Sequence, residues 1–110
     1  SINIVMNFLN AFLKCEFKNA SYLKYTLPIQ NYYLIKWFPS SNTDIHGHDG
    51  KQCDFMILNG SLSEKRYGLN AIISDTVLQP LKKYSINDQI GAHSMHNTDE
   101  KVKWSIHKYY

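Results

Sequence analysis

The stretch His46-Gly47-His48-Asp49-Gly50-Lys51-Gln52-Cys53 contains two histidines separated by one residue. Side chains two positions apart in an extended strand point to the same face, so His46 and His48 can reach one ion while Gly47 faces away. A third imidazole is available from His93, in the second half of the chain. Three neutral imidazoles suit Fe, Zn, Cu or Ni and leave coordination positions open for a substrate. The sequence therefore predicts a catalytic metal site at His46, His48 and His93.

Runs rich in β-branched and aromatic residues lie on both sides of this stretch, at 32–38, 53–58, 71–78 and 102–109. Such runs are typical of strands, and turn-forming residues such as Asn59 and Gly60 separate them. No helical pattern lies between the runs, which predicts an all-β sandwich or barrel of the jelly-roll type. A chain of 110 residues accommodates one domain with one core, so a single domain is expected over 1–110.

The first residues follow a different pattern. Apolar residues at positions 2, 5, 6, 9, 12 and 13 recur with helical spacing. They predict a short amphipathic helix over 1–18 that packs on a barrel formed by 22–110, although a membrane-surface or partner helix has the same pattern. Cys15 is expected to pack on this helix as a small apolar group.

Composition and charge exclude several classes of protein. Hydrophobic content of 44% and charged content of 19% are ordinary for a folded protein. The net charge of +3 comes with scattered lysines rather than a basic run interleaved with aromatics, so no nucleic-acid partner is expected. The apolar stretch 2–13 is shorter than the ~20 residues that span a bilayer, and it lacks the features of a secretory signal. With two cysteines that nothing marks as a pair, a cytoplasmic protein without membrane contact is expected.

Two stretches resemble the two sequence motifs of the cupin superfamily. The first begins at His46 and ends at Gly60, with Cys53 in the place of the usual glutamate. The second covers 93–97, where a histidine is followed four residues later by an asparagine.

Further features resemble one branch of these proteins, the cysteine dioxygenase family of thiol dioxygenases. They are the cysteine at position 53, the run 86–93 before the third histidine, and the spacing of Ser105, His107 and Tyr109. The similarity covers roughly 22–109.

This resemblance implies a cupin-type jelly-roll barrel that holds one Fe(II) ion on His46, His48 and His93. The implied reaction adds both atoms of O₂ to the sulfur of cysteine, or of a related small thiol carboxylate, and gives a sulfinic acid. Three neutral imidazoles leave about two positive charges at the iron to hold a thiolate and oxygen, whereas a carboxylate ligand would cancel part of that charge.

The resemblance also implies roles for residues around the metal. Cys53 is expected to form a thioether bond with Tyr109. Ser105, His107 and Tyr109 occupy alternate positions of a predicted strand and are expected to face the barrel interior, where they position the reacting groups.

A cationic side chain is expected to hold the substrate carboxylate, as an arginine two residues after a tyrosine does in the cysteine-specific members of the family. The best match here is Tyr22 and Lys24. Lysine offers a point charge instead of the planar fork of arginine, which predicts altered substrate selection. A rival placement on Tyr25 and Leu27 removes the cation. Arg66 could then replace it from a neighbouring strand, or be a solvated turn residue.

Two functional interpretations stay open. The first is an iron-dependent thiol dioxygenase, which the retained Ser105, His107 and Tyr109 favour. The second is a non-catalytic or sensor-type cupin that binds a metal or small ligand, which the shortness of the chain favours. A zinc or nickel isomerase is a weaker third, since it normally needs the glutamate that Cys53 replaces. His96 is expected to face solvent, and pairing of sheet edges would give a homodimer.

Overall fold

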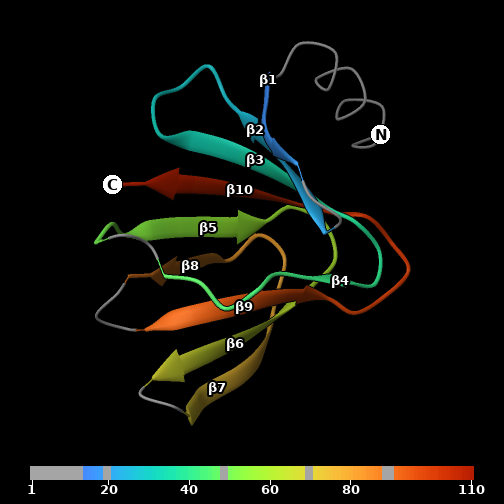
Figure 1. The fold of residues 1–110 in the computed structure, drawn as a ribbon. Coiled ribbons are helices and arrows are strands. Elements are labelled where there is room, and N and C mark those ends of the chain that lie inside the picture. The colour runs from blue at the N-terminus through green and yellow to red at the C-terminus, as the bar shows by residue number, and fades with distance from the viewer. Residues whose placement is uncertain (1–13, 19–20, 48–49, 69–70, 88–90) are drawn as a thin grey trace.

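The computed structural model describes residues 14–18, 21–47, 50–68, 71–87 and 91–110 (Figure 1). Over these residues the chain forms ten strands and no helix, which confirms the predicted all-β class for this part of the chain. In chain order the strands are β1 (Lys14–Lys18), β2 (Tyr22–Thr26), β3 (Tyr32–Trp37), β4 (Ser41–Asn42), β5 (Cys53–Ile57), β6 (Leu62–Gly68), β7 (Ala71–Leu78), β8 (Lys83–Ile86), β9 (Ala92–Asn97) and β10 (Lys103–Tyr109). The described residues include no helix that could cross a bilayer.

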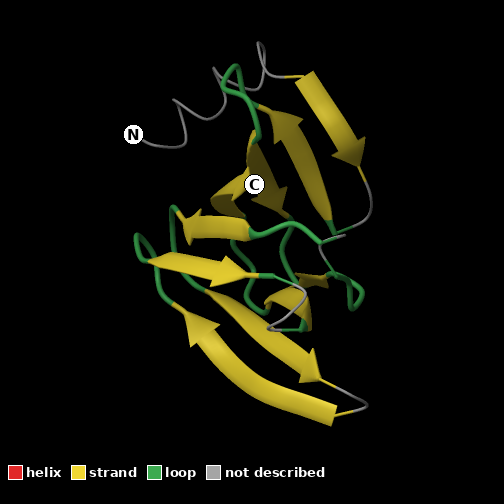
Figure 2. Ribbon diagram, turned by 90° about the vertical axis from the view of Figure 1, so that its left-hand side faces the viewer, coloured by secondary structure: helices red, strands yellow, loops and turns green. Residues whose placement is uncertain are grey.

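The strands form two antiparallel sheets. The first has six strands in the order β1-β2-β3-β10-β5-β8, and the second has four in the order β4-β9-β6-β7. Figure 1 shows the six-stranded sheet in the upper part of the view and β9, β6 and β7 in the lower part, and Figure 2 shows the same strands from the side. Apolar side chains of both sheets meet in one core, and among them are Ile35, Trp37, Phe55, Ile57, Leu62 and Met95. A core between two layers is the usual way in which such sheets bury their inner faces.

The predicted helix over 1–18 is wrong for its last residues. Lys14–Lys18 form strand β1, which pairs antiparallel with β2 and so satisfies its backbone groups in a sheet. The apolar positions that suggested a helix end at 13, before this strand begins, and residues 1–13 lie outside the described residues. Cys15 is exposed on β1 and does not pack as a core residue.

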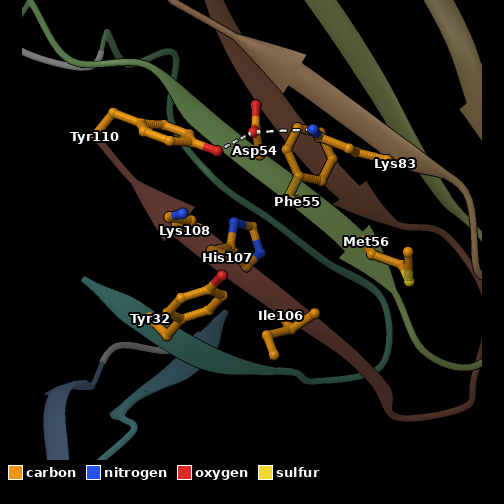
Figure 3. A pocket seen from close by; sticks show the side chains of 9 residues that line it. All are labelled: Tyr32, Asp54, Phe55, Met56, Lys83, Ile106, His107, Lys108 and Tyr110. Atoms are coloured by element: carbon orange, nitrogen blue, oxygen red, sulfur yellow. Dashed lines mark hydrogen bonds and ion pairs between the residues drawn. The ribbon is translucent and has the colours of Figure 1, made fainter. Parts of the chain in front are cut away.

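Strands β5 and β10 form the part of the six-stranded sheet that carries the site. On β5, Cys53, Phe55 and Ile57 are at most 2% exposed, because every second side chain points into the core. Their neighbours Asp54 and Met56 line a hollow on the opposite face (Figure 3). Strand β10 pairs with β5 so that Tyr109 lies opposite Cys53 and His107 opposite Phe55.

A second pairing brings together two segments that are far apart in the sequence. The amide of His46 donates to the carbonyl of His93 at 2.9 Å, and the amide of His93 donates to the carbonyl of His46 at 3.0 Å. The amide of Thr43 likewise donates to the carbonyl of Met95 at 2.9 Å. The segment after β4 therefore runs beside β9, and this backbone contact fixes the distance between the two histidines.

Candidate metal centre

A cavity of about 270 Å³ lies between the two sheets. Several of the residues predicted for the site line it together, namely Tyr22, Lys24, His46, Cys53, His93, His107 and Tyr109. They come from β2, β5, β9, β10 and the segment after β4. The fold thus gathers residues from most of the described chain around one small space.

The rings of His46 and His93 face each other in this cavity. Their Nε2 atoms are 3.0 Å apart. The Nδ1 atom of His46 is 3.0 Å from the carbonyl oxygen of Asp44, and the Nδ1 atom of His93 is 2.9 Å from Oε2 of Glu64. Both partners are oxygen acceptors, so each Nδ1 carries the proton and donates it. Each Nε2 of a neutral ring then presents a lone pair toward the other.

Two lone pairs at this distance need a cation between them, either a proton or a metal ion. The separation of 3.0 Å is that of an N–H···N hydrogen bond, and it is also short enough for both nitrogens to bind one metal ion. Although part of His46 is exposed, burial of its ring lowers its pKa, which keeps the ring neutral at pH 7. A neutral imidazole with its Nδ1 proton held by an acceptor is the form that binds metals through Nε2.

The third predicted ligand, His48, lies outside the described residues. Among the residues that are described, no three His, Cys, Asp or Glu side chains come together as a metal-binding group. The described part of the candidate centre therefore consists of His46 and His93.

Behind the cavity, Ser105 connects Trp37 to His107. The indole Nε1 of Trp37 donates to the Ser105 hydroxyl at 2.8 Å, and that hydroxyl is 2.7 Å from Nε2 of His107. Ser105 is fully buried, so its own proton must find an acceptor, and His107 Nε2 is in position to accept it. The proton of the neutral His107 ring then lies on Nδ1, which is 3.7 Å from the sulfur of Cys53.

Cys53 and Tyr109 lie opposite each other on β5 and β10, and their side chains are hydrogen-bonded. Burial raises the pKa of the Cys53 thiol to about 12. Burial also raises the pKa of Tyr109, and the neighbouring Cys53 adds to this effect. Both groups therefore keep their protons at neutral pH, and the Tyr109 hydroxyl is the donor in its hydrogen bond to the Cys53 sulfur.

Tyr109 is held in place by contacts on both sides of β10. Its amide donates to the carbonyl of Asn31 at 2.9 Å. The next residue, Tyr110, donates its hydroxyl to Oδ2 of Asp54 at 2.7 Å on the outer face (Figure 3). Asp54 also accepts the hydroxyl of Ser85 at 2.6 Å, so the carboxylate is itself fixed.

Lys24 is the cation that the structure brings to this cavity. Its Nζ lies 4.3 Å from the centre of the Tyr33 ring and 4.8 Å from that of the Tyr109 ring. The rival placement of the tyrosine pair is not favoured, because Tyr25 packs in a separate cluster with Leu34 and Trp104. On β2, alternation puts Tyr22 and Lys24 on the cavity side and Tyr25 on the other.

Arg66 does not line the cavity. Its Nε donates to Oε1 of Glu64 at 2.8 Å, and its Nη2 donates to the carbonyl of Ser85 at 2.8 Å. It is neither a solvated turn residue nor placed to meet a substrate in this cavity. His96 also lies outside the cavity, where its Nε2 is 2.8 Å from the hydroxyl of Ser94.

Two residues at the site were missed by the sequence analysis. Glu64 is 3% exposed and contacts His93, and Trp37 is 2% exposed and contacts Ser105. Glu64 stands two residues after Leu62 on β6, so alternation from a core leucine would have pointed to a buried carboxylate. Burial raises the pKa of Glu64, but hydrogen bonds from His93 and Arg66 outweigh it and hold that pKa below its usual value.

Comparison with solved structures identifies the fold. The CENP-C cupin domain of Drosophila melanogaster superposes with a TM-score of 0.68 at 14% identity, covering 96% of this chain and 92% of that one. A predicted oxalate decarboxylase from Thermotoga maritima gives 0.65 at 18% identity, with 80% and 78% covered. An oxalate oxidase gives a TM-score of 0.61 at 16% identity. The matched part covers 71% of this chain but only 40% of the oxalate oxidase chain. At these identities the likeness concerns the fold, which is that of a cupin.

The family follows from the sequence itself. The family model for cysteine dioxygenase type I matches residues 28–110, which is most of the chain, and the chain belongs to this family. No curated protein matches it. Family membership, together with the facing histidines, supports a metal-dependent enzyme of the cupin class.

Proposed function

We propose that this protein is an iron-dependent thiol dioxygenase that converts cysteine, or a related small thiol carboxylate, to its sulfinic acid. The reaction is RSH + O₂ → RSO₂H, in which sulfur loses four electrons, O₂ gains them, and both oxygen atoms form bonds to sulfur. The observation that carries the proposal is that Cys53, His107 and Tyr109 line the same cavity as His46 and His93. A site that only binds a metal has no need of a thiol, an imidazole and a phenol beside it.

The metal in this proposal is Fe(II), held by the Nε2 atoms of His46 and His93 together with His48. When bound, the iron would supply open coordination positions and positive charge for a thiolate and O₂. The fixed Nδ1 partners of His46 and His93 keep their Nε2 lone pairs directed into the cavity before any ion arrives.

The protein side chains then orient the substrate. Lys24 holds the substrate carboxylate as a point charge, while Tyr109 donates its hydroxyl hydrogen bond to the reacting groups. Cys53 contacts Tyr109 on one side and His107 on the other, and Ser105 sets the proton position on His107. The cavity of about 270 Å³ is small, which restricts the substrate to a short thiol.

The proposed thioether between Cys53 and Tyr109 is compatible with their position. Residues directly opposite each other on antiparallel strands have Cβ atoms about 5 Å apart, within reach of a sulfur and a phenol ring. Forming the bond joins sulfur to a ring carbon and removes the thiol hydrogen and one ring hydrogen. O₂ takes up the two electrons and two protons that are released.

Oxygen uptake and product mass test this function. The protein is loaded anaerobically with Fe(II), mixed with a panel of small thiols and then exposed to O₂. We expect one O₂ to be consumed per product formed, and the product to carry two additional oxygen atoms on sulfur. Metal binding without oxygen uptake for any thiol would instead support the non-catalytic cupin.

The role of Lys24 gives a prediction about substrate selection. We expect Lys24→Ala to raise the KM for cysteine about tenfold or more, because a charge-assisted contact with the carboxylate is lost. The KM for cysteamine, which lacks a carboxylate, should change little. Initial rates with both thiols measure this difference, and Lys24→Arg should retain most of the affinity for cysteine.

Lys36→Ala is a suitable control for this prediction. Lys36 lies on β3, and its Nζ is 5.5 Å from the centre of the Trp104 ring. Trp104 belongs to the separate cluster that it forms with Tyr25 and Leu34. The control should leave both KM values unchanged. Equal effects of Lys24→Ala on the two thiols would rule out a carboxylate contact.

A further inference from the structure

We propose that Glu64 is a positioning residue for His93, and that Arg66 positions Glu64 in turn. Glu64 would fix the proton of His93 on Nδ1 and the orientation of its ring, so that Nε2 is ready to bind a metal ion. The inference rests on the proposed role of His93 as a ligand. It assigns Arg66 to the support of the metal centre instead of the substrate.

The contacts of Glu64 leave its carboxylate little freedom. Oε2 is 2.9 Å from Nδ1 of His93, and Oε1 is 2.8 Å from Nε of Arg66, so each oxygen has its own donor. Arg66 is anchored by a second bond, from Nη2 to the carbonyl of Ser85 at 2.8 Å. The side chain of Glu64 is 3% exposed and that of His93 5% exposed, so water competes little for these contacts.

Strand register explains why these residues meet. On β6 and β9, Arg66 lies directly opposite His93 and Glu64 opposite Met95. Glu64 is therefore the diagonal neighbour of His93, at a distance that a long side chain can cover. Since Glu64 and Arg66 are two residues apart on one strand, they share a face and pair with each other.

A carboxylate has a chemical advantage over other partners at this place. An ionised carboxylate can only accept hydrogen bonds, so the neutral ring of His93 must carry its proton on Nδ1 and expose the Nε2 lone pair. An amide could instead turn its NH₂ group toward the ring and favour the opposite tautomer. Arg66 balances the charge of Glu64, so the positive charge of a bound ion would not be cancelled by a lone buried carboxylate.

His46 provides an internal comparison. Its Nδ1 partner is the backbone carbonyl of Asp44, which no side-chain substitution removes. The Nδ1 partner of His93 is instead a side chain, that of Glu64, and a substitution can remove it. A substitution at Glu64 therefore tests one ligand while the other keeps its partner.

The experiment measures metal affinity in the variant Glu64→Gln, which keeps the shape of the side chain. Metal-free protein is titrated with Co(II) and with Fe(II) under anaerobic conditions, and thermal unfolding is recorded in parallel. We expect the dissociation constant to rise about 10- to 100-fold, the usual effect of removing such a partner. The control Glu100→Gln removes the same charge at an exposed position and should bind metal like the wild type.

A second measurement needs no metal. In protein labelled with ¹⁵N-histidine, the wild-type ring of His93 should show the Nδ1-protonated tautomer, and Glu64→Gln should show a mixture. A role confined to stability would lower the unfolding temperature without changing this tautomer. Wild-type affinity and tautomer in folded Glu64→Gln would overturn the inference.

Arg66→Gln keeps the inference testable if Glu64→Gln does not fold. The side chain of Arg66 is 19% exposed, and its loss leaves Glu64 in contact with His93 but free to turn. We expect weaker metal binding in the same direction, and unchanged affinity would overturn the inference. If the wild type bound no metal, the proposed function would be wrong. The tautomer measurement would still test whether Glu64 fixes the proton of His93.

Discussion

Replacing His93 by alanine is expected to abolish stoichiometric metal binding. His93 supplies one of the two Nε2 atoms that lie 3.0 Å apart. Glu64 holds its ring, and two backbone hydrogen bonds to His46 hold its main chain. Removing a ligand should weaken binding by more than the roughly 100-fold that loss of a supporting contact costs. Metal content after loading and dialysis, measured by elemental analysis, should fall from about one ion per chain to near zero.

A matched control is available on the same strand. His96 lies three residues further along β9, and its Nε2 contacts the hydroxyl of Ser94 outside the cavity. His96→Ala removes an imidazole from the same element and should leave metal content unchanged. If His93→Ala retained one tightly bound ion, the facing histidines would not be the metal centre.

The strands that the sequence predicted are those whose inner and outer faces both favour β structure. The runs at 32–38, 53–58, 71–78 and 102–109 match β3, β5, β7 and β10 closely, because they are dense in aromatic and β-branched residues. Their alternation also placed Ser105, His107 and Tyr109 on one face, and the buried Ser105 and His107 agree with it.

Two strands that escaped prediction, β6 and β9, carry Glu64 and His93. Strand β6 reads as a polar segment because Glu64, Lys65 and Arg66 follow one another, yet Glu64 is buried against His93. Strand β9 is also polar, since it presents His93 to the cavity. Local sequence patterns do not predict a strand whose polar side chain is buried against a partner from a distant strand.

The candidate site was predictable in part. His46 was identified from the histidine spacing, and Cys53 and Tyr109 were identified from the family resemblance. All three line one cavity. The partners that fix their protons could not be identified in the same way. Trp37 reaches Ser105 only because β3 and β10 pair in the observed register, in which Ile35 lies opposite Ser105. Such contacts depend on register, and hydrophobic patterns do not specify it between distant strands.

Replacing Tyr109 by phenylalanine is expected to lower kcat for thiol oxidation about 100-fold while iron stays bound. The substitution removes the hydroxyl that meets Cys53, and positioned proton donors commonly contribute at least this factor. The aromatic ring that lies 4.8 Å from the Nζ of Lys24 is retained, so the KM for cysteine should change little. Oxygen consumption at several cysteine concentrations separates the two effects.

The pH profile gives this prediction a further test. Burial raises the pKa of Tyr109, so its hydroxyl stays protonated across the range of about pH 6 to 9. The ratio of wild-type to variant kcat should therefore be constant over that range. Tyr32→Phe is the matched control, because Tyr32 lies opposite Lys108, lines the hollow on the outer face and loses the same group there (Figure 3). Unchanged turnover in Tyr109→Phe, with the control also unchanged, would deny the hydroxyl a part in the reaction.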